Sequence, residues 1–558
     1  MPVIRVYKWD LERLLGKTLS KEEILDLLPR IKCEVEEIGE DGLIEYEATH
    51  DRPDLYSVEG LARALRFLLG VEHREYVFVD EGVEAYNLGV PRRPYVGFAI
   101  VRDLELDEEA VKQIMQLQEK LATTYGRSRR KASIGVYDLD TFKLPVYYEL
   151  VDPKKTRFIP LNDSRIMNLR EILAETEKGR EYGYLLDGWD KLPVLRDSEG
   201  KILSMPPIIN GEGTKVTEET KNVLIDSTGI DPKTVIDMVT IMATSIAERS
   251  RSRKIVYVDT INPDGTIIRA PRSQPKEVKL DISYAESIIG TKISVEEAIK
   301  LLKKMEITPS KTEDKTIIVY VPPYRLDILE EIDLIEELAM AIGYDTIGRD
   351  AHRLPPAYHP GRIHPLEHLS RRFRSALVGL GYIEVANYMM SNPAIQLGIF
   401  GISDEDMILV KNPKMDKYTG LRRWLTPGLL EVILENKERL KDIRIFEIGD
   451  VAIPDKESET GAIIEKRLGI AISHEKATLT DGLAVINALF NRFSIKPLYE
   501  KKYVKGFLKE RTASITVNGE EVGFVGEIDP RVLYRLGMDR PVVVAEIIMD
   551  KVLILINH

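Results

Sequence analysis

The chain is poor in the residues that build disulfide frameworks and multi-cysteine metal sites. Its 558 residues include a single cysteine, Cys33, and eight histidines. One thiol forms no internal disulfide, and it cannot supply a zinc site made of several cysteines. Disulfide-stapled secreted scaffolds are therefore excluded, and the composition favours a reducing, cytoplasmic environment.

Long apolar runs are also missing. A membrane-spanning helix needs roughly 18 consecutive apolar residues, and no stretch of the sequence approaches that length. The longest candidate, from Pro541 to Ile556, is interrupted by Glu546, Asp550 and Lys551. The N-terminal residues lack the apolar core of a signal peptide. The sequence therefore predicts no association with a membrane.

An excess of positive charge is the third absence. The chain has 79 basic and 91 acidic residues and a net charge of −12, whereas proteins that coat nucleic acid by bulk electrostatics are basic. Two short basic runs, 127–131 and 249–254, offer places for local contact with RNA. Solvated surface is the alternative interpretation of such runs. Any contact with RNA is therefore expected to be local and shared with another chain.

The most informative feature that is present is an internal repeat. Residues 14–28 align with residues 288–302, an offset of 274, and each copy has a turn glycine followed by a Ser-x-x-Glu capping box. Apolar residues at helical spacing follow each box. A second pair, 51–55 and 324–328, lies at nearly the same offset. The repeat predicts two small modules with the same fold.

These features predict an α+β multidomain protein. Two related small α/β modules, 1–88 and 273–350, flank a mixed domain, 89–272, in which apolar strands alternate with helices. A proline-rich break opens the last domain, 351–558, which ends in strand-rich segments with a hairpin turn at Asn518-Gly519. A hydrophobic content of 44% with 30% charged residues is typical of such globular domains.

One familiar metal motif fails on inspection. His364 and His368 match the H-x-x-E-H pattern of some zinc proteases, which requires both imidazoles on one face of a continuous helix. Pro365 suits the first position of a helix and leaves His364 at the cap, so no zinc is expected there.

A group of carboxylates carries the strongest chemical signal. If a helix begins near Leu329, then Asp333, Glu336 and Glu337 lie on one face of it, and Asp327 can fold back towards that face. Oxygen ligands of this kind suit Mg²⁺. The alternative is an acidic helix start, which the helix dipole stabilises. The corresponding stretch of the first module lacks the later carboxylates, so the fold itself does not require them.

Several segments together resemble the beta subunit of phenylalanyl-tRNA synthetase, of the archaeal/eukaryal type. The resemblance runs over essentially the full length and depends on the order and spacing of the segments. They are 50–65, 323–337, 421–430, 444–450 and 523–530.

The resemblance implies a chain that supports ATP-dependent charging of tRNA(Phe) by an alpha subunit, within a tetramer of two alpha and two beta chains. The last domain would then be an inactive, class II synthetase catalytic-like domain with an antiparallel sheet. The four carboxylates would hold Mg²⁺, and the middle domain would hydrolyse tyrosyl-tRNA(Phe) made in error. A free-standing tRNA-binding or editing factor without an alpha partner is the alternative.

Four residues are predicted for the editing pocket from the resemblance. Asp226 would recognise the hydroxyl of tyrosine, Thr228 and Ser204 would position the ester or the attacking water, and Asn210 would orient the adenosine end. A strand end that turns on polar residues is the alternative interpretation of 226–229. Tyr137 departs from the family pattern, in which histidine is more common, and this departure leaves the fine substrate preference open.

Overall fold

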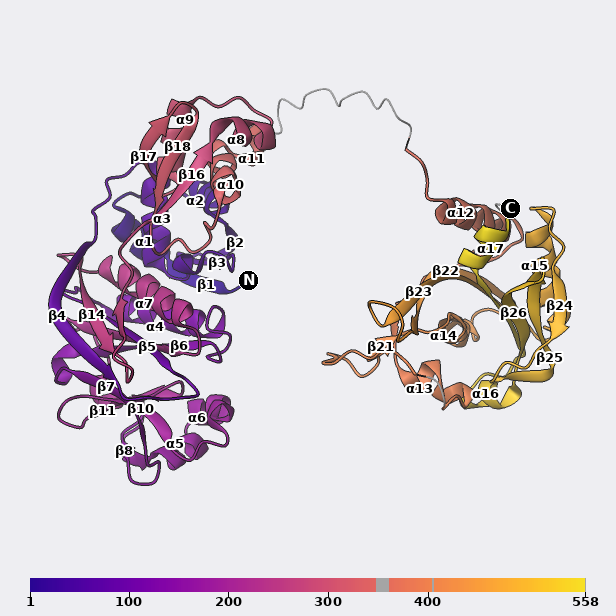
Figure 1. Cartoon of the computed structure of the whole chain (residues 1–558), viewed down its shortest axis with the longest axis horizontal. Coiled ribbons are helices and arrows are strands. Elements are labelled where there is room, and N and C mark those ends of the chain that lie inside the picture. Colours follow the sequence, from indigo (N-terminus) through magenta and orange to yellow (C-terminus); the bar gives the residue numbers. More distant parts are fainter. Residues whose placement is uncertain (348–360, 404–405, 557–558) are drawn as a thin grey trace. The chain divides into compact units, whose positions relative to one another are not determined.

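The protein folds into two compact units, Met1–Leu354 and Pro355–His558 (Figure 1). The computed structural model describes residues 1–347, 361–403 and 406–556. Both units combine helices with sheets, as the predicted α+β class requires. Within these described ranges every helix is too short or too polar to cross a membrane.

The first module is a three-stranded antiparallel sheet in the order β1-β3-β2, accompanied by three helices. Ser20 and Glu23 form the predicted capping box at the start of α2. The elements are β1 (Val3–Tyr7), α1 (Lys8–Leu15), α2 (Lys21–Leu27), β2 (Cys33–Ile38), β3 (Leu43–Ala48) and α3 (Val58–Leu69).

The repeated sequence folds into the same element order a second time. Its sheet has the order β16-β18-β17, which corresponds strand for strand to that of the first module. Ser294 caps α9 by accepting from the backbone N–H of Glu297. The elements are β16 (Lys276–Asp281), α8 (Ile282–Ile289), α9 (Val295–Lys304), β17 (Thr308–Glu313), β18 (Thr316–Val321), α10 (Glu331–Ile342) and α11 (Tyr344–Ile347).

Between the modules lies a ten-stranded sheet in the order β12-β11-β10-β7-β4-β14-β5-β13-β6, with β15 paired to β14. Helices α4 (Glu108–Thr123) and α7 (Pro232–Ala247) lie between this sheet and the first module (Figure 1). The strands are β4 (Val77–Asn87), β5 (Tyr95–Val101), β6 (Ala132–Asp138), β7 (Val146–Val151), β10 (Leu192–Arg196), β11 (Ile202–Met205), β12 (Ile209–Asn210), β13 (Val223–Gly229), β14 (Lys254–Ile261) and β15 (Ile267–Ala270).

The position of β4 corrects one predicted boundary. The sequence places the end of the first module at residue 88, but β4 pairs with β14 and β7 of the ten-stranded sheet. The strand is exposed or half-buried over most of its length, acidic residues interrupt its apolar positions, and its partners are distant in the sequence. The first module therefore ends with α3.

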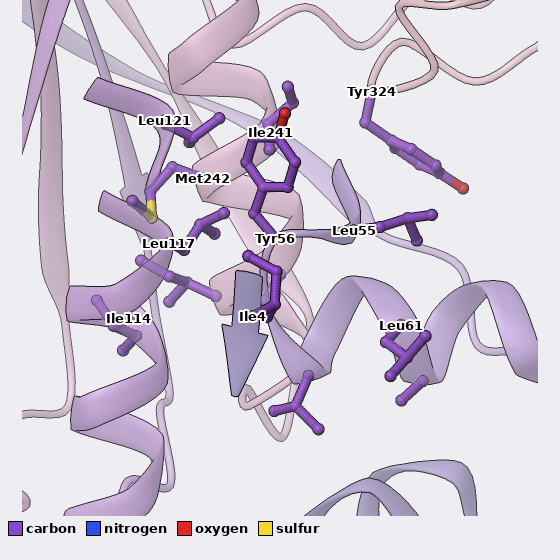
Figure 2. Close-up of a cluster of buried hydrophobic side chains, with 14 of the residues drawn as sticks. Ile4, Leu55, Tyr56, Leu61, Ile114, Leu117, Leu121, Ile241, Met242 and Tyr324 are labelled. Carbon is purple, nitrogen blue, oxygen red and sulfur yellow. The ribbon is translucent and has the colours of Figure 1, made fainter. Parts of the chain in front are cut away.

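One hydrophobic core joins the first module to the middle domain. Figure 2 shows side chains of α4 and α7 packed around residues of the first module, and Tyr324 of the second repeat belongs to the same cluster. The buried residues that it labels are Ile4, Leu55, Tyr56, Leu61, Ile114, Leu117, Leu121, Ile241, Met242 and Tyr324.

The second unit is built on a seven-stranded sheet in the order β19-β22-β23-β27-β26-β25-β24, antiparallel except for the β19–β22 pair. Asn518 and Gly519 both have positive φ, as the predicted hairpin turn requires. The strands are β19 (Ile383–Glu384), β22 (Ile443–Pro454), β23 (Ala462–Ser473), β24 (Leu498–Lys501), β25 (Phe507–Val517), β26 (Glu520–Ile528) and β27 (Val542–Ile548).

The helices of the second unit include the one that carries the failed zinc motif. His364 caps α12, and its Nδ1 accepts from the backbone N–H of Leu366 at 3.3 Å, so it lies outside the helix as predicted. The proline-rich break at 353–360 lies outside the described residues. The helices are α12 (Pro365–Gly379), α13 (Pro393–Gln396), α14 (Thr426–Asn436), α15 (Leu479–Asn491), α16 (Pro530–Arg535) and α17 (Met549–Ile556).

Candidate functional site

A cavity of about 350 Å³ lies in the middle domain, where strands from both ends of the sheet order face one another. Ser204, Asn210 and Asp226, three of the four residues predicted for the editing pocket, line it. Thr228 does not. The cavity therefore brings together residues that the sequence places on three separate strands.

The sheet positions these residues by its register and its curvature. β13 lies between β5 and β6, and the register sets Asp226 opposite Gly135 of β6. Ser204 of β11 is paired with Asn210 of β12. Although β12 and β6 are the two ends of the strand order, the Asn210 amide donates to the Val136 carbonyl at 3.4 Å. The sheet therefore curls until its ends meet around the cavity.

A buried hydrogen-bonded chain forms the polar end of the cavity. The Tyr137 hydroxyl lies 2.8 Å from Ser204 Oγ and 2.6 Å from Asp226 Oδ1. A hydroxyl has one proton, so Tyr137 donates to the carboxylate and accepts from Ser204. A side chain at Gly135 would place its Cβ 2.4 Å from Asp226 Oδ1, so only glycine fits beside this pair.

The carboxyl group of Asp226 has an unusual affinity for protons. Burial raises its pKa to about 7, while the hydrogen bond from Tyr137 and the nearby Arg93 guanidinium oppose the rise. Asp226 is only 2% exposed. A carboxyl with a pKa near neutrality in a cavity is a candidate for a functional group.

Thr228 lies behind the cavity wall. Arg93 donates to Thr228 Oγ1 at 2.9 Å and to Ser133 Oγ at 2.9 Å, and both Arg93 and Thr228 are buried. Burial lowers the pKa of Arg93 to about 10. Ser133 lines the cavity. Arg93 and Thr228 therefore support Ser133, and the structure does not bring Thr228 into the cavity.

Sequence reasoning missed the cationic side of the cavity. Arg129 lines it, donates to the Ile208 carbonyl at 2.8 Å, and pairs with Glu119 at 2.9 Å. Its guanidinium also lies over the Tyr182 ring, 4.1 Å from the centroid. Arg129 is in the basic run 127–131, which the sequence alone suggests as a local RNA contact or as solvated surface. The run alone gives no signal that one arginine points inwards.

The predicted metal ligands occupy three different environments. Asp327 accepts two hydrogen bonds from Arg325, at 2.9 and 2.8 Å. Asp333 caps α10 by accepting from the backbone N–H groups of Leu329 and Glu330, at 2.7 and 2.8 Å. Glu336 pairs with Lys32 at 2.9 Å.

Glu337 is the ligand candidate that protein donors satisfy least. It is fully buried, and neither of its carboxylate oxygens has a hydrogen-bond partner, although Arg325 Nη2 lies 2.6 Å from Oε1 as an ion pair. Burial raises the pKa of this carboxyl. Across the described ranges no three His, Cys, Asp or Glu side chains converge on a common point. The donor chemistry suits Mg²⁺, but the present arrangement does not form its coordination sphere, so the Mg²⁺ site stays a prediction.

Three protein-family models match parts of this chain. The "tRNA synthetase B5 domain" family matches residues 278–344, which include the carboxylates, and the "B3/4 domain" family matches 110–262, which include the cavity residues. The "Phenylalanyl tRNA synthetase beta chain CLM domain" family matches 335–549.

Full-length relatives decide the family. The phenylalanine–tRNA ligase beta subunit of Thermofilum pendens is 42% identical over 558 residues, covering 99% of this chain and 98% of the relative. The beta subunit of Thermococcus sibiricus is 37% identical, with 98% of each chain covered. The chain belongs to the phenylalanine–tRNA ligase beta subunit family. This confirms the resemblance, including its archaeal type.

A solved relative of this beta subunit family has a similar fold. It is an N-terminal fragment of the phenylalanyl-tRNA synthetase beta subunit from Pyrococcus horikoshii. The fragment is 39% identical, with a TM-score of 0.59, and the match covers 62% of this chain and all of the fragment.

Proposed function

We propose that the chain acts as the beta subunit of a phenylalanine–tRNA ligase and that its cavity hydrolyses tyrosyl-tRNA(Phe). The support for the ligase role is the near-complete coverage of relatives that carry this name. The support for the editing role is a buried carboxylate, Asp226, at the wall of a cavity of about 350 Å³. That volume lies within the usual range of small-molecule pockets.

The limited selectivity of an apolar pocket explains why such a ligase needs a second site. Tyrosine differs from phenylalanine by one hydroxyl, and an apolar synthetic pocket rejects an added hydroxyl by only about 10²-fold. A second pocket with a polar end can select the hydroxyl that the first one tolerates. Asp226 supplies that end in this proposal, since a buried carboxylate gains a hydrogen bond from a phenol and nothing from a phenyl ring.

The remaining cavity residues suit an ester attached to a nucleotide. Ser204 carries a hydroxyl that Tyr137 links to Asp226, and the Asn210 side chain also lines the cavity, where it would orient the adenosine end. Arg129 and Lys178 also line the cavity and supply positive charge. These cations suit the phosphates of a tRNA end, even though the whole chain is acidic.

A role for the second unit in assembly is part of the proposal. Arg422 lies in a segment that resembles the catalytic-like domain, but its guanidinium is buried, pairs with Glu447 at 2.5 Å, and donates to the Asp450 carbonyl at 2.8 Å. This arginine is occupied by partners within the protein. An alpha subunit would therefore supply phenylalanine and ATP binding, in a tetramer of two alpha and two beta chains.

The free-standing editing factor remains the alternative, and no observation favours it. Purification from the native source distinguishes the two, because the beta-subunit role requires a second, synthetase-like chain in the same complex. Isolation of this chain alone, with editing activity, would support the alternative.

The decisive test of editing is Asp226→Ala in the assembled ligase. Phenylalanine charging should stay within about twofold of the unmodified complex, while tyrosyl-tRNA(Phe) should accumulate because the hydroxyl loses its acceptor. Tyrosyl-tRNA hydrolysis should fall by about tenfold or more. Acid-gel analysis of charged tRNA measures both products.

The matched control is Asp259→Ala, on β14 of the same sheet. Asp259 forms an exposed ion pair with Arg269 and does not line the cavity. It should leave both charging and hydrolysis unchanged. If Asp226→Ala hydrolyses tyrosyl-tRNA as fast as the control, Asp226 does not belong to the site.

A further inference from the structure

Tyr137 occupies one of the two acceptor oxygens that Asp226 could offer to a hydroxylated ligand. Its hydroxyl donates to Asp226 Oδ1 at 2.6 Å, and both side chains line the cavity and are at most 2% exposed. Over the described part of the chain, Tyr137 is the one hydrogen-bond donor to this carboxylate. The protein's own phenol therefore makes the contact that a tyrosyl ligand would make.

The arrangement is built into the strands around it. Gly135, two residues before Tyr137, faces Asp226 across the β6–β13 ladder. A Cβ there would lie 2.4 Å from Asp226 Oδ1 and 2.5 Å from the Tyr137 hydroxyl. Ser204 completes the chain by donating to the same phenol, at 2.8 Å. Gly135, Ser204 and Asp226 together thus fix the position of the Tyr137 hydroxyl.

The pairing changes how strongly the cavity can discriminate. A site that binds a ligand hydroxyl rejects the analogue without it by about 10⁴–10⁵, because its buried polar group is then left unpaired. Here one oxygen of the Asp226 carboxylate, Oδ1, is already paired when a ligand without a hydroxyl enters. A phenyl ring therefore leaves a carboxylate that keeps one hydrogen bond, and this source of discrimination is weakened.

We infer that Tyr137 is a specificity-determining residue of the cavity: by donating to Asp226, its phenol limits the preference for tyrosyl over phenylalanyl esters. This inference rests on the proposed editing function. The chain should prefer the tyrosyl ester by about 10²-fold, well below the value for a site with an unpaired carboxylate. Removal of the Tyr137 hydroxyl should increase the preference.

The test compares kcat/KM for hydrolysis of tyrosyl-tRNA(Phe) and phenylalanyl-tRNA(Phe) by the full-length chain. Tyr137→Phe should raise the ratio of the two values by about tenfold or more, through slower hydrolysis of the phenylalanyl ester. Tyr46→Phe is the matched control. Its hydroxyl is also buried and donates to the Leu55 carbonyl at 2.7 Å, but it lies in the first module. The control should leave the ratio unchanged.

The outcomes separate the inference from the function on which it rests. If the unmodified chain hydrolyses neither ester, the proposed function fails. If it prefers the tyrosyl ester by about 10⁴ or more, editing stands and the inference is wrong. An unchanged ratio in folded Tyr137→Phe also overturns the inference. Should this variant fail to fold, the ratio of the unmodified chain still decides.

A pH profile adds a readout that a purely structural role would not move. The phenol favours the ionised form of Asp226, whose pKa is about 7, so its loss should raise that pKa. In Tyr137→Phe, the increase in the tyrosyl-to-phenylalanyl ratio of kcat/KM should then appear at higher pH. A pH profile of this ratio that does not shift would contradict direct coupling between Tyr137 and Asp226. The other titratable or charged groups around the carboxylate or the cavity are Arg93, Tyr148, Arg129, Glu119 and Lys178.

Discussion

Single residues of the cavity show what a sequence can and cannot reveal. Asp226 and Ser204 could be predicted because the segments around them resemble those of a known family. The link between them, the phenol of Tyr137, could only be noted as a departure. Its role depends on how far the sheet curls, which is a property of many non-local hydrogen bonds and not of the residue itself.

The predicted metal site poses a competition between cations. Lys32 lies 2.9 Å from Glu336 and 3.9 Å from Asp327, while Arg325 pairs with Asp327 and Glu337. These two side chains pair with three of the four carboxylates that the sequence assigns to Mg²⁺, Asp327, Glu336 and Glu337. A bound ion would have to displace Lys32 or draw Glu336 away from it, since like charges repel at short range.

Magnesium binding should be visible as a stability effect. If the carboxylates hold Mg²⁺, the melting temperature of the chain with its alpha subunit should rise with Mg²⁺ concentration, because binding to the folded state stabilises it by mass action. At about 100 times the dissociation constant the gain is about 2.7 kcal/mol. Asp333→Asn with Glu337→Gln should abolish this dependence. Differential scanning calorimetry measures it.

The magnesium dependence, and not the melting temperature alone, carries that test. Asp333 caps α10 and Glu337 pairs with Arg325, so the double variant should lose stability even without a metal. Glu296→Gln, an exposed acidic residue in the first turn of α9, is the control and should keep the full dependence. If the melting temperature of the unmodified complex does not change with Mg²⁺ concentration, a stabilising ion is excluded.

At the scale of elements, the two repeated modules exchange charged side chains. Lys32 and Glu306 occupy equivalent positions, 274 residues apart, and both have left-handed backbone conformations with φ of 65° and 66°. Lys32 reaches Glu336 in the second repeat. Glu306 reaches Arg52 and Arg63 in the first, at 3.1 and 3.2 Å. The repeat was readable in the sequence, but this reciprocal pairing was not, because the two positions carry opposite charges.

The Glu306 contacts should be essential for the joint between the modules. Glu306→Gln removes the carboxylate shared by Arg52 and Arg63, all of which are at most 2% exposed. Removal of one partner of a buried ion pair costs about 3–5 kcal/mol, since the remaining charge is left without compensation. Urea denaturation followed by circular dichroism should show this loss in the transition of the first unit.

An exposed glutamate of the same module provides the comparison for Glu306. Glu313 on β17 forms a surface ion pair with Lys311, and such pairs contribute about 0–1 kcal/mol. Glu313→Gln should therefore leave the transition nearly unchanged. Equal effects of the two substitutions would show that the buried network does not hold the modules together.

At the scale of the whole molecule, features that depend on local sequence patterns could be predicted, whereas pairings between distant segments could not. The helix Glu108–Thr123, the strand Tyr95–Val101 and the repeated modules follow from local periodicity and capping. The pairing of β4 within the ten-stranded sheet does not follow from local periodicity or capping. The structural role of the basic run 249–254 also could not be predicted from the local sequence. Arg249 is buried and pairs with Asp10 at 2.6 Å, which binds the middle domain to the first module.

The division of labour between two chains gives the last prediction. The chain alone should show no phenylalanine-dependent pyrophosphate exchange, because Arg422 is engaged with Glu447 and the sequence around it lacks an Arg-x-Glu triplet that would grip ATP. Addition of the alpha subunit should restore exchange, while the hydrolysis of tyrosyl-tRNA should not depend on ATP. Exchange by the isolated chain, in a preparation free of other synthetases, would show that the second unit has its own catalytic site.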